Sequence, residues 1–332
     1  MLLPAYKLTI GNKQLDTTHS SKTSTVTDIE ICLDMDTPAD SMTIRLGQVN
    51  GLQPAVGDDT TAWLGYSDDG NLAQVIAGSV TRVEQNAETK RVVAHSPASI
   101  LLRSFTENTY EGKAAGEIVK DLADQANVAV DTAEDGINLP AFVIDGRRSF
   151  YYHMKSLADL SGFDLYFNAD GKLVFKKFTS GNQVHSFQYG KDIARWSDSA
   201  SPAFAGRVEA WGESPADSNG ADSWPWLTKD FSGSKGTAGS GDPLYLLQQP
   251  ALRTASAAQS AADAAYSTIQ HNRLRGQLLV LGRADLMLGD ALELRNMPDQ
   301  ALNETFQIRS VRHHVSKQRG FTTTIHFRPI KP

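Results

Sequence analysis

The chain has 332 residues, of which 40% are hydrophobic and 21% are charged, and its formal net charge at pH 7 is −6. This length predicts two or three domains with cores of their own, and the composition is that of a folded protein. Binding to nucleic acid depends on clustered Lys and Arg, and the chain contains no such run. We therefore expect no specific nucleic-acid binding.

The single cysteine, Cys32, excludes an internal disulfide and favours a reducing compartment. Its place in a strand-like run makes a small buried apolar residue a better interpretation than a nucleophile. Residues 1–7 lack the features of a signal peptide, and no stretch approaches the roughly 20 apolar residues that span a bilayer. The sequence predicts a cytoplasmic protein that does not insert into a membrane by itself.

Short β-like runs separated by turn residues fill the first part of the chain. The runs around Val26, Ala62 and Val80 alternate partially between apolar and polar residues, as half-buried strands do. We predict a small antiparallel, tube-like β-barrel over residues 1–100.

The pattern then changes to helical spacing. Ala115, Ile118, Val119 and Leu122 lie on one helical face, and a second helix is expected from Ser149 to Gly162. Two β-like runs, 163–167 and 172–176, flank a turn and predict a hairpin. Residues 101–195 are therefore expected to form an inserted α/β domain.

Residues 196–332 are predicted to form a second β-barrel similar to the first. It would be interrupted by a Ser- and Gly-rich excursion at 214–253 and by an Ala-rich helix at 255–272. The predicted fold class is thus α+β, mainly β, with two similar barrels, an inserted α/β domain and an Ala-rich helix.

A repeated pattern supports two copies of one module. Ser79 lies 22 residues after Gly57, Ser310 lies 21 residues after Gly289, and a histidine follows each serine by 16 residues. The markers of this repeat are Gly57, Asp58, Ser79, Val80, Gly289, Asp290, Ser310 and Val311. Three such chains in a ring would present six similar modules, which suits an adaptor between a six-fold and a three-fold partner.

Patterns that would indicate catalysis or a cofactor are missing from the sequence. The glycine-rich run 236–241 is followed by Asp242 and not by the Lys and Ser or Thr of a phosphate-binding loop. His313 and His314 are adjacent in a predicted strand and would point to opposite faces, which disfavours a shared metal. We expect no enzyme activity, no cofactor and no metal.

Large aromatic residues stand out in the polar excursion. Trp224 and Trp226 flank a proline, and Phe231 follows shortly after. Exposed aromatics often anchor interfaces, but the same residues can also hold a loop against its own domain. The three residues are candidate partner contacts.

Three sequence runs together resemble the phage late control protein D family, over about residues 5–330. The first run is 117–123 in the first predicted helix, the second is 154–175 from the second helix into the hairpin, and the third is 288–323. The family is the baseplate hub of contractile tails and related injection systems.

The resemblance implies a trimeric hub whose paired barrels make a pseudo-six-fold ring. One face would dock the hexameric tail tube and the other would seat a trimeric spike, with other baseplate proteins around them. The chain stops soon after its second barrel, so the spike is expected to be a separate protein. Such a hub would be assembled in the bacterial cytoplasm and then become part of the phage tail or injection particle.

Two other functions compete with the hub. A tail-associated cell-wall hydrolase or glycan-binding protein would need a cleft with two facing carboxylates. A protein that polymerises alone into a tube needs one barrel per subunit, so the predicted pair of barrels speaks against it.

Overall fold

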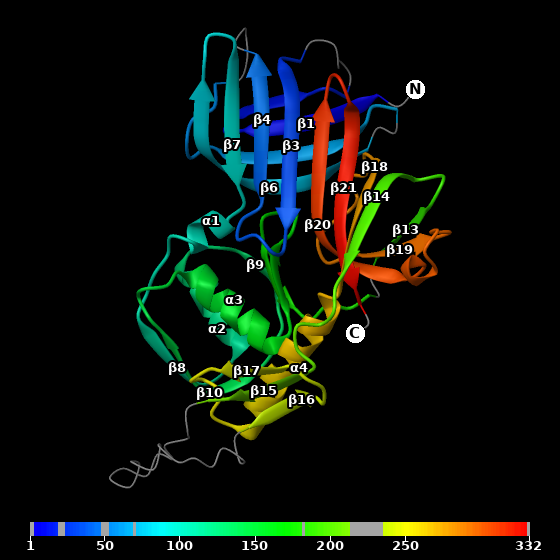
Figure 1. Ribbon diagram of the computed structural model, residues 1–332. Helices are drawn as coiled ribbons and strands as arrows, with labels where there is room; N and C mark the ends of the chain where they lie inside the picture. Colours follow the sequence, from blue (N-terminus) through cyan, green and yellow to red (C-terminus); the bar gives the residue numbers. More distant parts are fainter. Residues whose placement is uncertain are drawn as a thin grey trace.

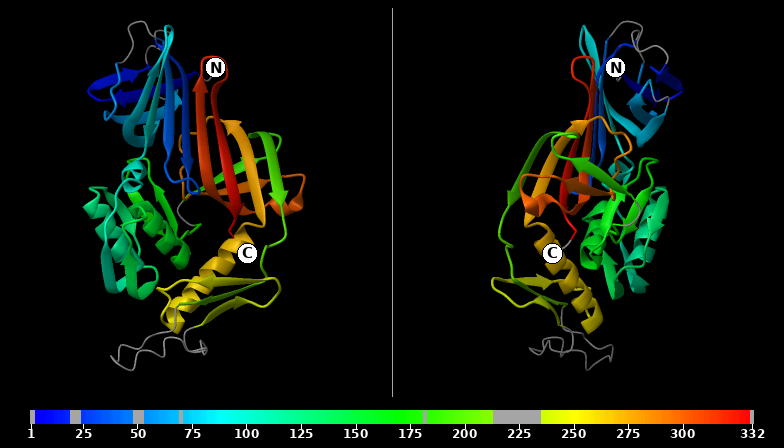
Figure 2. Two further views of the ribbon diagram at one scale, coloured as in Figure 1. Left: turned by 60° about the vertical axis from the view of Figure 1, so that its left-hand side comes forward. Right: turned by 90° about the vertical axis from the view of Figure 1, so that its right-hand side faces the viewer.

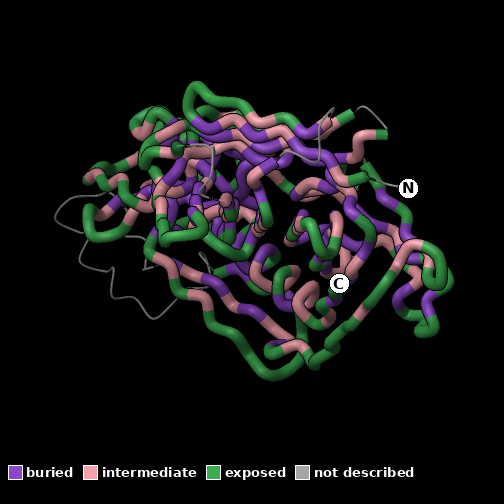
Figure 3. Tube along the Cα trace, turned by 90° about the horizontal axis from the view of Figure 1, so that it is seen from above, coloured by how far each residue is buried: buried purple, intermediate pink, exposed green. Residues whose placement is uncertain are grey.

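The computed structural model describes residues 3–18, 24–47, 53–68, 71–180, 183–212 and 235–330. These residues are mainly β, and they form a large sheet with a smaller helix-containing unit beneath it (Figure 1). Apolar side chains gather in two clusters, one inside the large sheet and one inside the lower unit. Exposed residues collect on the outer loops when the molecule is seen from above (Figure 3).

The large sheet has 13 strands and draws on both ends of the chain. The first half contributes β1 (Pro4–Ile10), β2 (Lys13–Asp16), β3 (Val26–Asp34), β4 (Ser41–Gly47), β5 (Asp59–Tyr66), β6 (Leu72–Gln85) and β7 (Thr89–His95). The second half contributes β13 (Val184–Gln188), β14 (Ile193–Ala200), β18 (Leu274–Leu281), β19 (Ala291–Arg295), β20 (Thr305–Ser316) and β21 (Gly320–Pro329). A short 3-10 turn, η4 (Gln300–Leu302), connects β19 to β20.

The two halves of this sheet follow the same pairing path. In the first half the path runs β3, β4, β7, β6, β5, β1, and in the second it runs β14, β18, β21, β20, β19, β13. The strands occur in the same chain order in both halves. The one difference in direction is at the end of the path, where β1 is antiparallel to β5 but β13 is parallel to β19.

One antiparallel pair, β20 with β3, joins the two halves into a continuous sheet. The sheet is largely antiparallel, as predicted. Closure of each half into a separate tube-like barrel stays a prediction.

The lower unit contains the helices and three small sheets. Its elements are α1 (Ala98–Leu101), β8 (Asn108–Ala114), α2 (Ala115–Gln125), β9 (Val130–Ala133), β10 (Asn138–Ile144), α3 (Phe150–Ser161), β11 (Asp164–Phe167), β12 (Leu173–Lys176), β15 (Arg207–Trp211), β16 (Gly236–Gly239), β17 (Leu244–Gln248) and α4 (Ala255–His271). The side views show α4 and its small sheet beside the α2 and α3 part, all beneath the large sheet (Figure 2).

Local sequence signals predicted the three longer helices and the hairpin, but not the four-residue helix α1. Helix α2 buries its apolar stripe, and α3 ends at Gly162, whose φ of +66° suits glycine. Helix α4 begins after Thr254, whose side chain accepts the N–H of Ala257 at 3.2 Å. Strands β11 and β12 form the predicted antiparallel hairpin.

The segments group differently from the sequence divisions at 1–100, 101–195 and 196–332, which stay predictions as domain limits. Strands β13 and β14 pair within the large sheet although the division at residue 195 cuts through β14. Strands β15–β17 and helix α4, assigned to the second barrel, pack in the apolar cluster of the lower unit. Alternation within each strand carries no information on which sheet the strand joins.

Candidate functional site

Two turns with the same geometry start equivalent strands in the two halves. Gly57 and Gly289 have φ values of +96° and +86°, a region that favours glycine. Asp58 and Asp290 follow them, and each carboxylate accepts a backbone N–H from the residue three positions earlier, at 2.8 and 3.1 Å respectively. In both turns the glycine adopts the positive φ and the aspartate side chain accepts a hydrogen bond from the turn. The two Gly-Asp pairs therefore have the same structural role.

The backbone pairing after these turns defines which residues of the two halves correspond. The N–H of Val80 donates to the carbonyl of Asp58 at 2.8 Å, and the N–H of Ile308 donates to the carbonyl of Asp290 at 3.0 Å. One residue further on, at Thr81 and Arg309, each strand carries a bulge.

This register differs from the sequence spacing by three residues. Val80 corresponds to Ile308, whereas the spacing paired Ser79 and Val80 with Ser310 and Val311. The stretch from Gly57 to Val80 is longer than the stretch from Gly289 to Ile308, because strand β5 is longer than β19 and β6 extends further ahead of its bulge than β20 does. A count along the chain therefore misses the register.

Eight strands of the large sheet make one wall that spans both halves. In order across the wall they are the second half of β6, then β7, β4, β3, β20, β21, β18 and β14. No described strand pairs with the outer edge of β14, and none pairs with the outer edge of β6 beyond Val80. These two open edges lie at opposite sides of the wall in Figure 1.

One face of this wall is polar and carries side-chain contacts across the junction between the halves. His314 Nε2 lies 2.7 Å from Asp28 Oδ2, and Arg312 pairs with Glu30. Each pair has one partner on β20 and one on β3. Such partly exposed pairs contribute at most about 1 kcal/mol each, so they align the strands more than they stabilise them.

An ionic cluster built on the buried residues Arg309 and Asp164 ties the wall to the lower unit. Arg309, at the bulge of β20, contacts Asp164 at the start of β11 and Asp36 after β3, both at 2.5 Å. Gln307 donates to Asp164 at 2.5 Å and accepts from Arg328 at 2.9 Å. Burial opposes the charge of Arg309, but the two carboxylates outweigh it and raise the pKa of Arg309, whereas burial and the neighbouring Arg309 lower the pKa of Arg328 to about 10.

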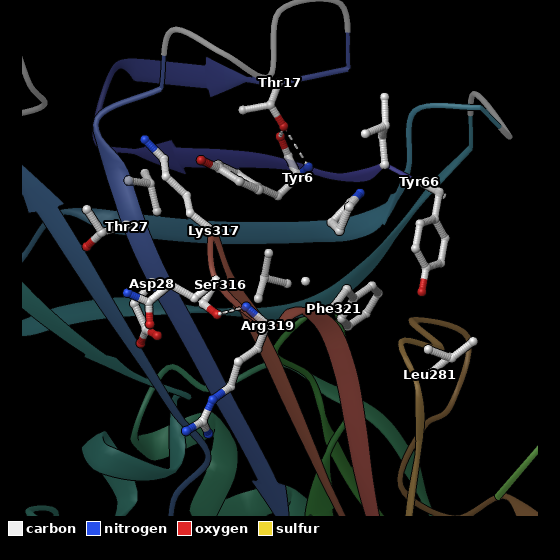
Figure 4. A pocket seen from close by; sticks show the side chains of 16 residues that line it. Tyr6, Thr17, Thr27, Asp28, Tyr66, Leu281, Ser316, Lys317, Arg319 and Phe321 are labelled. Atoms are coloured by element: carbon white, nitrogen blue, oxygen red, sulfur yellow. Dashed lines mark hydrogen bonds between the residues drawn. The ribbon is translucent and has the colours of Figure 1, made fainter. Parts of the chain in front are cut away.

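A hollow lies where the two halves meet, beside the start of β1 (Figure 4). Its volume is about 600 Å³, and β1, β3, β5 and the β20–β21 hairpin contribute to its lining. Tyr6, Tyr66 and Phe321 supply apolar rings, while Lys317 Nζ donates to the carbonyl of Ser24 at 2.8 Å. The hollow is a mixed groove between halves, and its Asp28 carboxylate has no second acid among the lining residues.

The structure places some of the residues singled out in the sequence and does not describe others. Trp224, Trp226 and Phe231 lie outside the described residues. His313 and His314 point to opposite faces, as alternation predicts: His313 is buried and contacts Thr323 Oγ1 at 3.0 Å, while His314 pairs with Asp28.

Within the described ranges, no group of three or more His, Cys, Asp or Glu side chains is arranged to hold a metal ion. No helix in this part of the chain is both long and apolar enough to cross a membrane.

Sequence reasoning missed the ionic cluster. Arg309 and Asp164 are far apart in the chain and only the fold brings them together. The available signal was Arg309 itself, a charged residue between Ile308 and Val311 in a strand-like run.

Comparison with known proteins gives a result at the level of structure. No family model and no curated protein sequence matches the chain. A 43 kDa tail protein of prophage MuSo2 from Shewanella oneidensis superimposes with a TM-score of 0.72 at 14% identity, over 98% of each chain. A tail protein from Neisseria meningitidis gives 0.71 at 14% identity, over 98% of this chain and 96% of that one.

A component of the type VI secretion system of E. coli superimposes less closely. Its TM-score is 0.58 at 12% identity, over 98% of this chain and 77% of that one. The similarity runs through nearly the whole chain in all three cases. The chain therefore has the fold of phage tail proteins and of related type VI secretion components, in agreement with the resemblance to baseplate hub proteins.

Proposed function

We propose that the protein is a structural component of a phage tail or a related injection particle, and that it acts as the hub between tube and spike. The observation that carries this proposal is the duplicated pairing path within one chain. A chain with two equivalent modules converts three-fold symmetry into near six-fold symmetry when three copies form a ring. The tail proteins with the same fold support the coarser part of this proposal, a structural role in a tail.

In this proposal each half of the large sheet is one tube-like barrel, and six of them form the ring. One face of the ring meets a hexameric tail tube, and the other meets a trimeric spike and further baseplate proteins. The protein would work by matching shapes and symmetries over large interfaces, without catalysis. It would reside in the assembled particle, after assembly in the bacterial cytoplasm.

The polar face of the wall suits the inner surface of such a ring. Its exposed side chains carry both signs of charge, as in the pairs of Arg312 with Glu30 and of Arg91 with Glu84. A surface of mixed charge does not retain a polyanion strongly, because retention needs clustered positive charge. The formal net charge of −6 is compatible with passage of DNA or protein cargo without binding.

The mass of the protein in solution tests the proposal. Light scattering across a dilution series is expected to show a species of about 108 kDa, three times the 36.1 kDa of one chain. Electron microscopy of that species should show a ring with six similar lobes. A monomer at every concentration, together with release of fragments from purified peptidoglycan, would replace the hub by the hydrolase alternative.

A further inference from the structure

We propose that neighbouring copies join through the two open edges of the wall: β14 of one copy pairs antiparallel with the second half of β6 of the next copy, with Ala200 opposite Val83. This inference rests on the proposed ring and deepens it by naming the surfaces that close it. The occupant of each open edge is a second copy of this chain.

The template for this contact is already present inside the molecule. Strands β20 and β3 join the two halves edge to edge, with Val311 opposite Leu33 and Arg312 opposite Cys32. In the duplicated path β20 corresponds to β6, and β3 corresponds to β14. The internal junction thus has a counterpart between β6 and β14, and in a single chain both of those edges are open in the described structure.

The register of the proposed contact between β14 and β6 follows from the register of the internal contact between β3 and β20. On the β6 side, the hydrogen bonds that equate Val80 with Ile308 also equate Val83 with Val311, because both strands have their bulge at the same place.

On the β14 side the equivalence passes through two strand pairs. Gly276 of β18 corresponds to Met42 of β4, since they face Phe327 and Ala94, which occupy equivalent positions. Their partners Asp198 and Ile31 then correspond, which equates Ser199 with Cys32 and Ala200 with Leu33. The resulting pairs are Val83 with Ala200, Glu84 with Ser199, and Gln85 with Asp198.

The side chains at these positions fit such a ladder. Val83 is half-buried and would face the small Ala200, while Glu84 would face the neutral Ser199. No pair places like charges directly opposite each other, an arrangement that would oppose the contact. The edges also lie at opposite sides of the wall, so repetition of the contact is head-to-tail and closes into a ring if the rotation permits.

Disulfide cross-linking tests the register. The full chain is prepared with Cys32→Ser, which removes the native thiol, and with Val83→Cys and Ala200→Cys together. A second variant carries Glu84→Cys and Ser199→Cys, two exposed positions where substitution does not disturb the core. Under mild oxidation each is expected to shift from one-chain to three-chain species on non-reducing gels, because opposed strand residues fall within disulfide reach.

The matched control is Val83→Cys with Ser197→Cys, in which the second position lies three residues away along β14. At about 3.3 Å per residue it is displaced by roughly 10 Å and points to the other face, so no cross-link is expected. Thermal melting of each variant confirms that it is folded.

The outcomes separate this inference from the proposed function. Cross-linking of both matched pairs but not of the control supports the junction. A trimer by light scattering in which neither matched pair cross-links overturns the junction and leaves the hub proposal standing. A trimer in which the Val83→Cys, Ser197→Cys control cross-links does the same. A chain that stays monomeric and yields no cross-link contradicts both.

Discussion

Asp40 is a carboxyl group that is buried within the first half of the sheet. Its side chain accepts the N–H of Asp34 at 2.9 Å, and burial raises its pKa to about 7. The folded protein therefore keeps a proton that the unfolded chain loses above pH 4, and stability falls as the pH rises from about 4 to about 7. We expect Asp40→Asn, which keeps the acceptor oxygen without the charge, to stabilise the protein at pH 8 by ~2–4 kcal/mol and to have little effect at pH 4.

Chemical denaturation at several pH values measures this difference. The control is Asp124→Asn, an exposed carboxylate on α2, which should follow the pH profile of the wild type. If Asp40→Asn did not raise the free energy of unfolding at pH 8, the folded protein would be shown to hold the charged Asp40 carboxylate without a cost in stability.

His313 has the opposite pH dependence. Its ring is fully buried on β20, Nε2 has no hydrogen-bond partner, and burial lowers its pKa to about 4. The unfolded chain takes up a proton below about pH 6.5 and the folded chain does not, so stability is lost as the pH falls from 6.5 toward 4. We expect His313→Leu to reduce that loss by up to ~3 kcal/mol, whereas His326→Gln on the exposed face of β21 should not.

The comparison uses the difference in unfolding free energy between pH 6.5 and pH 4.5 for each protein, which separates the protonation effect from any change in packing. Equal differences in His313→Leu and the wild type would contradict the prediction.

At the scale of elements, α4 approaches the β15–β16 sheet more closely than side chains of ordinary size allow. A Cβ atom on Gly236 of β16 would lie 2.2 Å from the backbone of Ala258, and the facing side of α4 is built from alanines. Gly236→Ala forces the helix and the sheet apart, and we expect a loss of ~1–3 kcal/mol from overpacking. Thr237→Ala, the adjacent exposed position on the same strand, is the control and should change stability by less than ~0.5 kcal/mol.

The melting temperatures of Gly236→Ala and Thr237→Ala, each compared with that of the wild type, measure the two losses of stability. Equal effects at the two positions would mean that the close approach of α4 to β16 is not what limits residue size there.

At the scale of the whole molecule, the cluster around Arg309 decides how the wall is held to the lower unit. Replacement by Met leaves Asp164 buried without its main counter-charge, for which we expect a loss of ~3–5 kcal/mol. Arg312→Met on the same strand removes an exposed ion pair and is expected to cost less than ~1 kcal/mol.

Urea unfolding monitored by fluorescence measures both variants. Hydrogen exchange should also show earlier opening between the lower unit and the wall in Arg309→Met. Similar losses for the two arginines would place the energetic link between the units elsewhere.

The sequence alone determined the features that depend on neighbours in the chain. The apolar stripe of α2, the end of α3 at Gly162, the Ala-rich α4 and the β11–β12 hairpin all follow from residues within one or two turns of each other. The duplication was visible too, since Gly57-Asp58 and Gly289-Asp290 form the same turn. Local backbone preferences depend on residues that are neighbours in the chain, so they can be predicted from the amino-acid sequence.

Only the tertiary structure decided which strands pair and in what register. The contact of β20 with β3, the three-residue offset between Val80 and Val311, and the pairing of Arg309 with Asp164 all join residues that are distant in the chain. Alternation of apolar and polar residues shows which face of a strand is buried but not which strand lies beside it. Partner and register are selected by loop lengths, bulges and burial summed over the whole sheet, and these act only when the chain is folded.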